Sequence, residues 1–437
     1  MDKFIKGYKN FLDNGKTERE CVNQIINQVE KAGYKNIYDV ETLKAGDKVY
    51  LNKMGKSVAL FCIGKEDIQK GMLILGAHID SPRLDIKQNP IYEKQGIVYL
   101  NTHYYGGIKK YQWLAMPLAL HGKVFLTNGE CIDLVLGEDP EDPVFCISDI
   151  LPHIADKQMK KTASEFIDGE DLDLVLGAFS QEKTGKKVIL DILEKEYGIK
   201  EEDFNSAEIE VVPAGKARDS GLNRDLILAY GQDDRVCSYS SLMAMLEVEN
   251  PQYTSSCILV DKEEIGSYGA TGMRSHFFDN AVAEVVGRIE GSSELKVRRC
   301  LANSYMLSSD VNSAFDPLNE DLYDKQNSSP LSRGVVFNKY TGGGGKFGSS
   351  DANPEFIVKL RKSMNADKVK YQFAELAKVD IGGGGTIAHM AAIFGMQVID
   401  CGVPVLSMHA PWELTSKEDV RQSFLAYRAF LKMEIFS

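Results

Sequence analysis

The stretch MLILGAHI (72–79) decides the fold class of this chain. It is short and almost entirely apolar, without the alternation of a half-exposed strand, as expected for a strand buried on both faces of a sheet. VALFCIG (58–64), CILV (257–260) and QVIDCG (397–402) share this pattern, and helical segments such as SYSSLMAMLEVE (238–249) lie between such runs. The sequence therefore predicts an α/β domain whose mixed sheet has helices on both faces.

The middle of the chain has a different sequence pattern. Between about 91 and 222, β-rich segments such as GIVYLNTHYY (96–105) and KVFLTNGECIDLVLG (123–137) are separated by frequent turns. We therefore predict a discontinuous α/β domain formed by residues 1–90 and 223–437, with an inserted β-rich domain at 91–222.

The composition excludes several classes of function. The formal net charge is −12, from 51 basic and 63 acidic residues, and no basic cluster is present that could follow a nucleic-acid backbone. No apolar run reaches membrane-spanning length, and the opening MDKFIKGYKNF lacks the apolar core of a signal peptide. The eight cysteines form no CxxC pair, which fits thiols in a reducing compartment. We therefore expect a cytoplasmic protein that binds neither nucleic acid nor a membrane.

The glycine-rich segment TGGGGKFGSS (341–350) resembles a phosphate-binding loop only superficially. Such a loop needs glycine at position 340 and serine or threonine after Lys346, whereas this chain has Tyr340 and Phe347. The segment is therefore predicted to be a local loop, and a nucleotide-binding module is excluded.

Five short segments at the ends of apolar runs carry residue types that ligate metals. They are GAHIDSPRLD (76–85), GQDDRVCSY (231–239), KEEIGS (262–267), SSDVNSAFDP (308–317) and LSMHAPWE (406–413). Each alone has little specificity, since such short motifs are common in surface loops. Their shared setting at strand ends, where open α/β sheets bind ligands, predicts a single site.

Two pairs within these segments have informative spacing. His78 and Asp80 are two residues apart and share one face of an extended chain, so the carboxylate can accept the second N–H of a ligating imidazole. Glu263 and Glu264 are adjacent, and on a strand their side chains would point to opposite faces. The following Gly266 predicts that the strand has ended and the chain turns, so that both carboxylates can serve one site.

In this order, GAHIDSP, QDDR, DKEEIGS, SSD and LSMHAPWE resemble the M18 aminopeptidases, the family of aspartyl aminopeptidase and vacuolar aminopeptidase I, and most of all its bacterial members. The resemblance runs from about residue 15 to the C-terminus. It implies a metallo-aminopeptidase that releases N-terminal amino acids from short peptides. It also implies two divalent metal ions about 3.5 Å apart, zinc or else cobalt or manganese.

The resemblance assigns a role to each motif. It implies that His78 and Asp310 hold one metal, that Glu264 and His409 hold the other, and that Asp233 bridges the two. It further implies that Glu263 is the general base, that Asp80 is the partner of His78, and that the peptide bond between Asp233 and Asp234 is cis.

Four of the remaining histidines and one lysine have expected roles outside the metal ligands. We expect His103, His121 and His276 to be hydrogen-bonded structural residues. In the resemblance, His153 matches a histidine that reaches a neighbouring subunit's active site, and Lys339 matches a substrate-side lysine. The alternatives are an ordinary partly buried histidine and a solvated lysine.

His389 is a further histidine that could be mistaken for a metal ligand. It follows GGGGTIA, where many relatives read TIGP. Because His409 fits the ligand motif better, we do not expect His389 to bind metal.

The resemblance also implies a homo-oligomer, in which the insert at 91–222 serves as a dimerisation or lid domain and dimers form a tetrahedral dodecamer. Two alternative functions remain open. A related co-catalytic metallohydrolase, such as an M42-type peptidase or an N-acyl amino acid amidohydrolase, would use the same adjacent acids. A catalytically silent scaffold could keep the peptidase fold without turnover.

Overall fold

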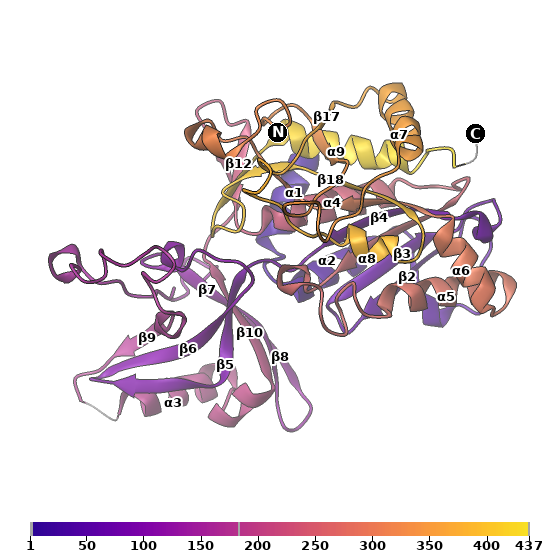
Figure 1. Cartoon of the computed structure of the whole chain (residues 1–437). Helices are drawn as coiled ribbons and strands as arrows, with labels where there is room; N and C mark the ends of the chain where they lie inside the picture. The colour runs from indigo at the N-terminus through magenta and orange to yellow at the C-terminus, as the bar shows by residue number, and fades with distance from the viewer. Residues whose placement is uncertain (1–2, 182–183, 436–437) are drawn as a thin grey trace. The chain divides into compact units, whose positions relative to one another are not determined.

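The computed structural model describes residues 3–181 and 184–435 (Figure 1). The chain forms two compact units. The larger unit contains the residues up to Asp80, Ala217–Met408 and the residues from Glu413 onward. The smaller unit contains Ser81–Lys216 and His409–Trp412.

The α-helices of the described residues are α1 (Lys3–Asp13), α2 (Glu18–Lys31), α3 (Gly185–Tyr197), α4 (Gln232–Leu246), α5 (Phe277–Glu290), α6 (Glu294–Ala302), α7 (Pro354–Ala366), α8 (Ala388–Ala392) and α9 (Lys417–Phe430). The strands are β1 (Lys35–Asn36), β2 (Lys48–Lys53), β3 (Ser57–Cys62), β4 (Met72–His78), β5 (Arg83–Lys94), β6 (Ile97–Tyr105), β7 (Leu118–Phe125), β8 (Cys131–Leu136), β9 (Leu174–Ala178), β10 (Ala207–Pro213), β11 (Arg218–Ser220), β12 (Leu226–Ala229), β13 (Thr254–Val260), β14 (Tyr305–Ser309), β15 (Asn312–Ser313), β16 (Val335–Asn338), β17 (Tyr371–Phe373), β18 (Gln397–Gly402), β19 (Pro404–Leu406) and β20 (Glu413–Ser416).

The larger unit is built on a mixed sheet with the strand order β1-β2-β3-β13-β4-β14-β18-β16-β17. The central strands β13, β4, β14 and β18 run parallel to their neighbours in that group, whereas β3 and β16 pair antiparallel with β13 and β18. The four apolar runs of the sequence form β3, β4, β13 and β18. The predicted α/β fold with a mixed sheet is therefore confirmed.

Successive residues of the central strands enter two different hydrophobic cores, one on each face of the sheet. In β4, Leu73 and Leu75 pack into the core shared with α1, α2, α4, α7 and α9, whereas Met72 and Ile74 pack into the core shared with α5, α6 and α8. Figure 1 shows α7 and α9 above this sheet and α5 and α6 below it. Each fully buried side chain of this size stabilises the fold by roughly 1.5–3 kcal/mol, which explains why these strands are mainly apolar on both faces.

A second sheet of the larger unit has the order β11-β12-β20-β19-β15. Ala229 of β12 lies opposite Glu413 of β20 in an antiparallel pair. This pairing brings the start of α4 beside the beginning of β20, although the two segments are far apart in the sequence.

The smaller unit has an antiparallel sheet with the order β8-β7-β10-β5-β6-β9. Helix α3 packs on β5, β6 and β9. The unit begins at Ser81, before the boundary predicted at 91, because β5 starts directly after the 76–85 segment. It also includes His409–Trp412, which the sequence division left in the α/β domain.

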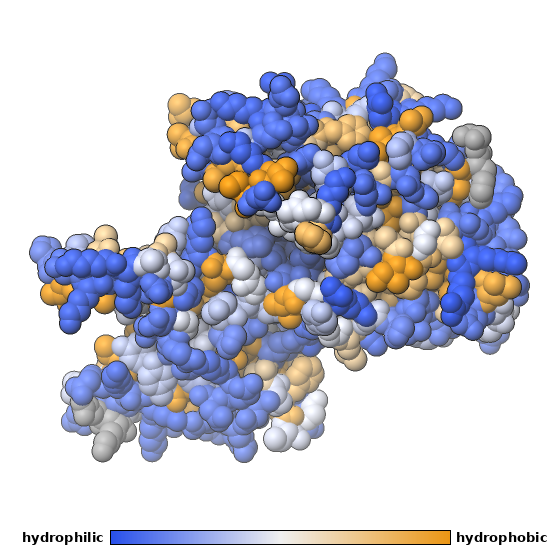
Figure 2. Space-filling model, viewed as in Figure 1, coloured by the Kyte–Doolittle hydropathy of each residue, from blue (hydrophilic) through white to orange (hydrophobic). Residues whose placement is uncertain are grey.

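Hydrophilic residues cover most of the face shown in Figure 2, and hydrophobic residues are scattered among them in small groups. Among residues 3–181 and 184–435, no helix combines the length and the apolar character that a membrane crossing requires. All eight cysteines are free thiols, and six of them are buried.

Candidate metal centre

The candidate ligands lie at one edge of the central sheet because three parallel strands end there. His78 is the last residue of β4, Asp310 follows β14, and the two glutamates follow β13. β4 lies between β13 and β14, and Val260 of β13 pairs with His78. The carboxyl ends of parallel strands are where α/β sheets place ligands, so the strand order itself gathers these side chains.

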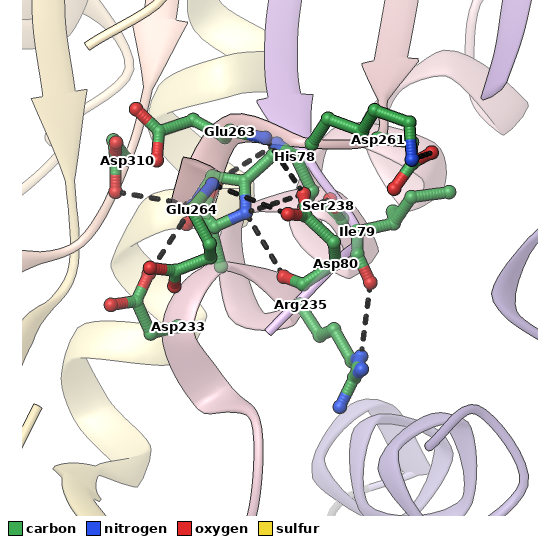
Figure 3. A network of polar contacts seen from close by, with 12 residues as sticks. His78, Ile79, Asp80, Asp233, Arg235, Ser238, Asp261, Glu263, Glu264 and Asp310 are labelled. Atoms are coloured by element: carbon green, nitrogen blue, oxygen red, sulfur yellow. Dashed lines mark hydrogen bonds and ion pairs between the residues drawn. The ribbon is translucent and has the colours of Figure 1, made fainter. Parts of the chain in front are cut away.

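Two donor groups within the described residues have the composition and spacing of metal sites. One contains His78, Glu263 and Asp310, and the other contains His78, Asp233 and Glu264. In each group, the ligand atoms lie within 4.8 Å of one another. His78 Nε2 is 3.3 Å from Asp233 Oδ1 and 3.7 Å from Asp310 Oδ1, and both contacts are drawn in Figure 3. His78 therefore belongs to both groups.

The turn that carries the two glutamates begins as soon as β13 ends. Lys262 has a left-handed backbone (φ 70°), the residues Glu263–Ile265 form a single 3₁₀ turn, and Gly266 (φ 85°) ends it. In this turn, unlike in a strand, consecutive side chains need not point to opposite faces. Glu263 and Glu264 can therefore both join a group with His78, as the sequence predicted.

Asp80 is close to His78, but its carboxylate has an additional role. His78 Nδ1 lies 3.1 Å from the Asp80 carbonyl oxygen and 3.4 Å from its carboxylate Oδ1. The two carboxylate oxygens accept the backbone N–H groups of Glu263 and Glu264, at 3.1 and 3.2 Å. A proton on Nδ1 that is donated to Asp80 leaves the lone pair of Nε2 for a metal. Asp80 thus orients the histidine and holds the glutamate turn.

Asp233 lies at the start of α4 with a non-helical backbone (φ −78°, ψ 108°). The peptide bond between Asp233 and Asp234 is cis, which confirms that prediction. Both carboxyl groups are buried. The Asp234 carboxylate accepts the backbone N–H of His78 at 3.4 Å, so it points to the backbone rather than to the donor groups.

Several carboxyl groups lie close together in this site, and they shift the pKa values of Glu263 and His78. Burial, and next the nearby Asp310 carboxylate, raise the pKa of the Glu263 carboxyl to about 8. Burial lowers the pKa of His78, but hydrogen bonds to Asp233, Asp310 and Asp80 outweigh it and hold that pKa well above its usual value. A divalent cation would relieve this repulsion, and histidine with carboxylates is a donor set that suits zinc, cobalt or manganese. The residues present therefore fit the metals that the sequence implies.

The structure does not bring His409 into either donor group of the described residues. His409 belongs to the smaller unit, where its Nδ1 lies 2.9 Å from the carbonyl oxygen of Gly107. An acceptor at Nδ1 leaves Nε2 as the atom for a metal, as at His78. Its role as a ligand stays a prediction.

The other predicted site residues are exposed. His153 lies in a short 3₁₀ turn, Pro152–Ile154, of the smaller unit, and it is exposed rather than partly buried. Lys339 follows β16 and is exposed as well. Their predicted functional roles stay predictions.

The remaining histidines have ordinary hydrogen-bond partners, as expected. Nδ1 of His103 lies 2.8 Å from the Tyr104 carbonyl oxygen, Nε2 of His121 lies 3.3 Å from Glu138, and Nδ1 of His276 lies 2.9 Å from Asp279.

His389 takes part in a contact that the sequence did not reveal. Its Nδ1 lies 2.7 Å from the carbonyl oxygen of Thr386, and its Nε2 lies 3.4 Å from Nη2 of Arg274. Arg274 Nε in turn donates to the carbonyl oxygen of Gly266, at the end of the glutamate turn. His389 is thus linked to that turn through an arginine and is absent from both donor groups of the described residues.

Comparisons with known proteins cover almost the whole chain. A family model described as aminopeptidase I zinc metalloprotease (M18) matches residues 11–431. The chain is 54% identical over 433 residues to a Clostridium acetobutylicum protein named probable M18 family aminopeptidase 1, which covers 97% of this chain and 93% of that one. The crystal structure of an M18 family aminopeptidase from Thermotoga maritima matches with a TM-score of 0.94 at 42% identity, covering 99% of this chain and 96% of that one. The S. cerevisiae mApe1 dodecamer structure shares the fold, with a TM-score of 0.80 at 21% identity over 98% of this chain and 96% of that one.

Proposed function

The chain belongs to the M18 family of zinc metallo-aminopeptidases, and on that premise we propose that it releases N-terminal amino acids from short peptides with two metal ions at the His78 site. The observation that carries this proposal is the pair of donor groups that share His78 at the edge of the sheet. Together the two groups offer one histidine and four carboxylates, which are more donors than one four-coordinate zinc ion takes.

We assign His78 and Asp310 to one ion, Glu264 and His409 to the other, and Asp233 to a position between them. The position of Asp233 supports this, since its Oδ1 lies 3.3 Å from His78 Nε2 and its carboxylate is grouped with that of Glu264. When bound, such ions polarise the scissile carbonyl and lower the pKa of water.

Glu263 is our candidate for the general base. It is not needed in the assigned ligand set, and the bond from its N–H to Asp80 fixes the turn that carries it. Its carboxylate would take a proton from the attacking water and return it to the departing amine. Glu263 also groups with His78 and Asp310, so it could instead be a metal ligand. Measuring the metal content of Glu263 variants distinguishes the two roles.

Glu264→Gln is expected to lose one of the two metal ions, because a neutral amide oxygen replaces a carboxylate in the ligand set. Elemental analysis after dialysis measures this. Glu263→Gln, in the same turn, is the matched control and should retain both ions. Two ions in Glu264→Gln and one in Glu263→Gln would show that the roles of the two glutamates are reversed.

The substrate is proposed to be a short peptide with a free α-amino group, with Lys339 as the candidate substrate-binding residue. The test is a panel of aminoacyl chromogenic substrates, each with a free or an N-acetylated amine, on metal-free protein reloaded with zinc, cobalt or manganese. We expect turnover of the free-amine substrates only. Preferential turnover of the N-acetylated series would favour the amidohydrolase alternative, and full metal content without any turnover would favour the silent scaffold.

The enzyme is proposed to be a cytoplasmic homo-oligomer, a tetrahedral dodecamer built from dimers, in which the smaller unit forms the dimer contact. Exposed apolar side chains next to His153 support this, namely Leu151, Ile154 and Met159. Ile154 is 71% exposed, and apolar groups gathered on a surface are typical of a partner contact. The free and mainly buried cysteines suit a reducing compartment.

His153→Phe is expected to lower kcat by roughly 10²–10³ while keeping metals and assembly, because a donor to the developing oxyanion is lost. Mixing it with Glu263→Gln under subunit exchange should restore some turnover, since some interfaces then pair an intact base with an intact histidine. His103→Phe, at an exposed histidine of β6, is the matched control and should remain active. A monomer by light scattering, or no restoration despite demonstrated exchange, contradicts the shared site.

A further inference from the structure

Several residues of the candidate centre have their backbone N–H groups held by buried acids that lie outside both donor groups. Asp80 accepts the N–H groups of Glu263 and Glu264, and Asp234 accepts that of His78. A carboxylate is a stronger acceptor than a neutral oxygen, and the bond fixes the backbone from which a ligand side chain projects. The same arrangement recurs at Asp233.

The acid that holds Asp233 is Glu413. Its Oε2 accepts the Asp233 N–H at 3.0 Å, and the residue is buried, with only 1% of its surface exposed. The backbone carbonyl of Glu413 accepts a hydrogen bond from Gln232 Nε2 at 2.7 Å. Glu413 therefore contacts two consecutive residues at the start of α4. The Gln232 amide oxygen accepts the Tyr8 hydroxyl at 3.1 Å.

The local backbone explains why Asp233 requires such a partner. The first N–H groups of a helix have no acceptor within the helix, and a buried N–H without an acceptor is costly. Gly231 precedes the helix in the left-handed region (φ 68°), and Asp233 itself is non-helical. The Glu413 carboxylate supplies the acceptor that the buried Asp233 N–H needs at this point of the chain.

We propose that Glu413 is a positioning residue for the metal centre, which fixes Asp233 for its place between the two ions. The proposal rests on the function proposed above only in that Asp233 is a metal ligand. Glu413 also begins β20, directly after the His409–Trp412 segment in the sequence.

The test is zinc affinity, measured by calorimetry on metal-free protein without substrate. Glu413→Ala is expected to weaken zinc binding by roughly 10- to 100-fold, the usual effect of losing a group that orients a ligand. Glu413→Gln keeps an acceptor for the Asp233 N–H and is expected to restore most of that affinity. Because no turnover is measured, failure of the proposed peptidase activity would leave this result interpretable.

Asp419 offers a matched control. It is another buried acid of the larger unit, and its carboxylate accepts the backbone N–H groups of Ser332 and Gly334 at 2.6 and 2.7 Å. It lies outside both donor groups. Asp419→Ala should lower the Tm of the metal-free protein and leave zinc affinity unchanged.

Glu413→Asp carries the test where Glu413→Ala does not fold. The aspartate side chain is one methylene shorter than glutamate, so its carboxylate does not reach the Asp233 N–H. This variant should therefore bind zinc more weakly than both the parent and Glu413→Gln. The proposal is overturned by parental zinc affinity in Glu413→Ala or Glu413→Asp, or by an equal loss of affinity in Asp419→Ala.

Discussion

Glu263→Gln is expected to retain both metal ions and to lower kcat by roughly 10²–10⁴, the usual contribution of a positioned acid–base group. The amide keeps the size of the side chain and removes its capacity to accept a proton. Its backbone N–H remains bonded to Asp80, so the turn and the neighbouring Glu264 should stay in place.

Steady-state kinetics at saturating substrate, with elemental analysis of the same samples, measure this effect. The loss should appear in kcat rather than in KM, because the base acts in the chemical step. Near-normal turnover with full metal content would remove Glu263 from the mechanism. A matching loss of metal and turnover would make Glu263 a ligand, as its grouping with His78 and Asp310 also permits.

Asp233→Ala is expected to remove both metal ions, whereas His409→Ala should chiefly weaken one. A carboxylate shared by two cations offsets their repulsion at short range, so its loss destabilises both sites together. His409 is assigned to a single ion, and the other ion keeps its ligands when that imidazole is removed.

Elemental analysis after dialysis against a weak chelator distinguishes these outcomes. Asp234→Ala is the informative comparison, since Asp234 contacts the His78 backbone and lies outside both donor groups. It should retain more metal than Asp233→Ala. Equal single-site losses in Asp233→Ala and His409→Ala would indicate that another residue bridges the two ions.

The sequence predicted the central strands because their environment is uniform. MLILGAHI is apolar from Met72 to Ala77, and the structure places alternate residues of β4 in two separate cores, so both faces of the strand favour apolar side chains. The strand order was not predictable in the same way. β4 lies between β13 and β14, and those pairings depend on contacts between residues more than 150 positions apart, which local patterns do not encode.

In the candidate site too, some residues were recognisable from the sequence and others were not. His78, Glu263 and Asp310 were recognisable because their residue types stand directly at the ends of apolar runs. The role of Glu413 was not recognisable, although it stands in LSMHAPWE, because its carboxylate meets a backbone N–H 180 positions away. A contact to backbone leaves no residue-type signal at the partner position. The packing of His409 with Gly107, 302 positions away, was hidden for the same reason.

The central claim is that two metal ions at the His78 site perform peptide hydrolysis, and stepwise zinc titration of metal-free protein tests it most directly. Bound zinc per chain and turnover of a free-amine aminoacyl substrate are measured at each addition. The two-ion mechanism predicts that binding saturates at two ions per chain and that most turnover appears with the second. Full turnover at one ion per chain, or turnover that persists after complete metal removal, would contradict the claim.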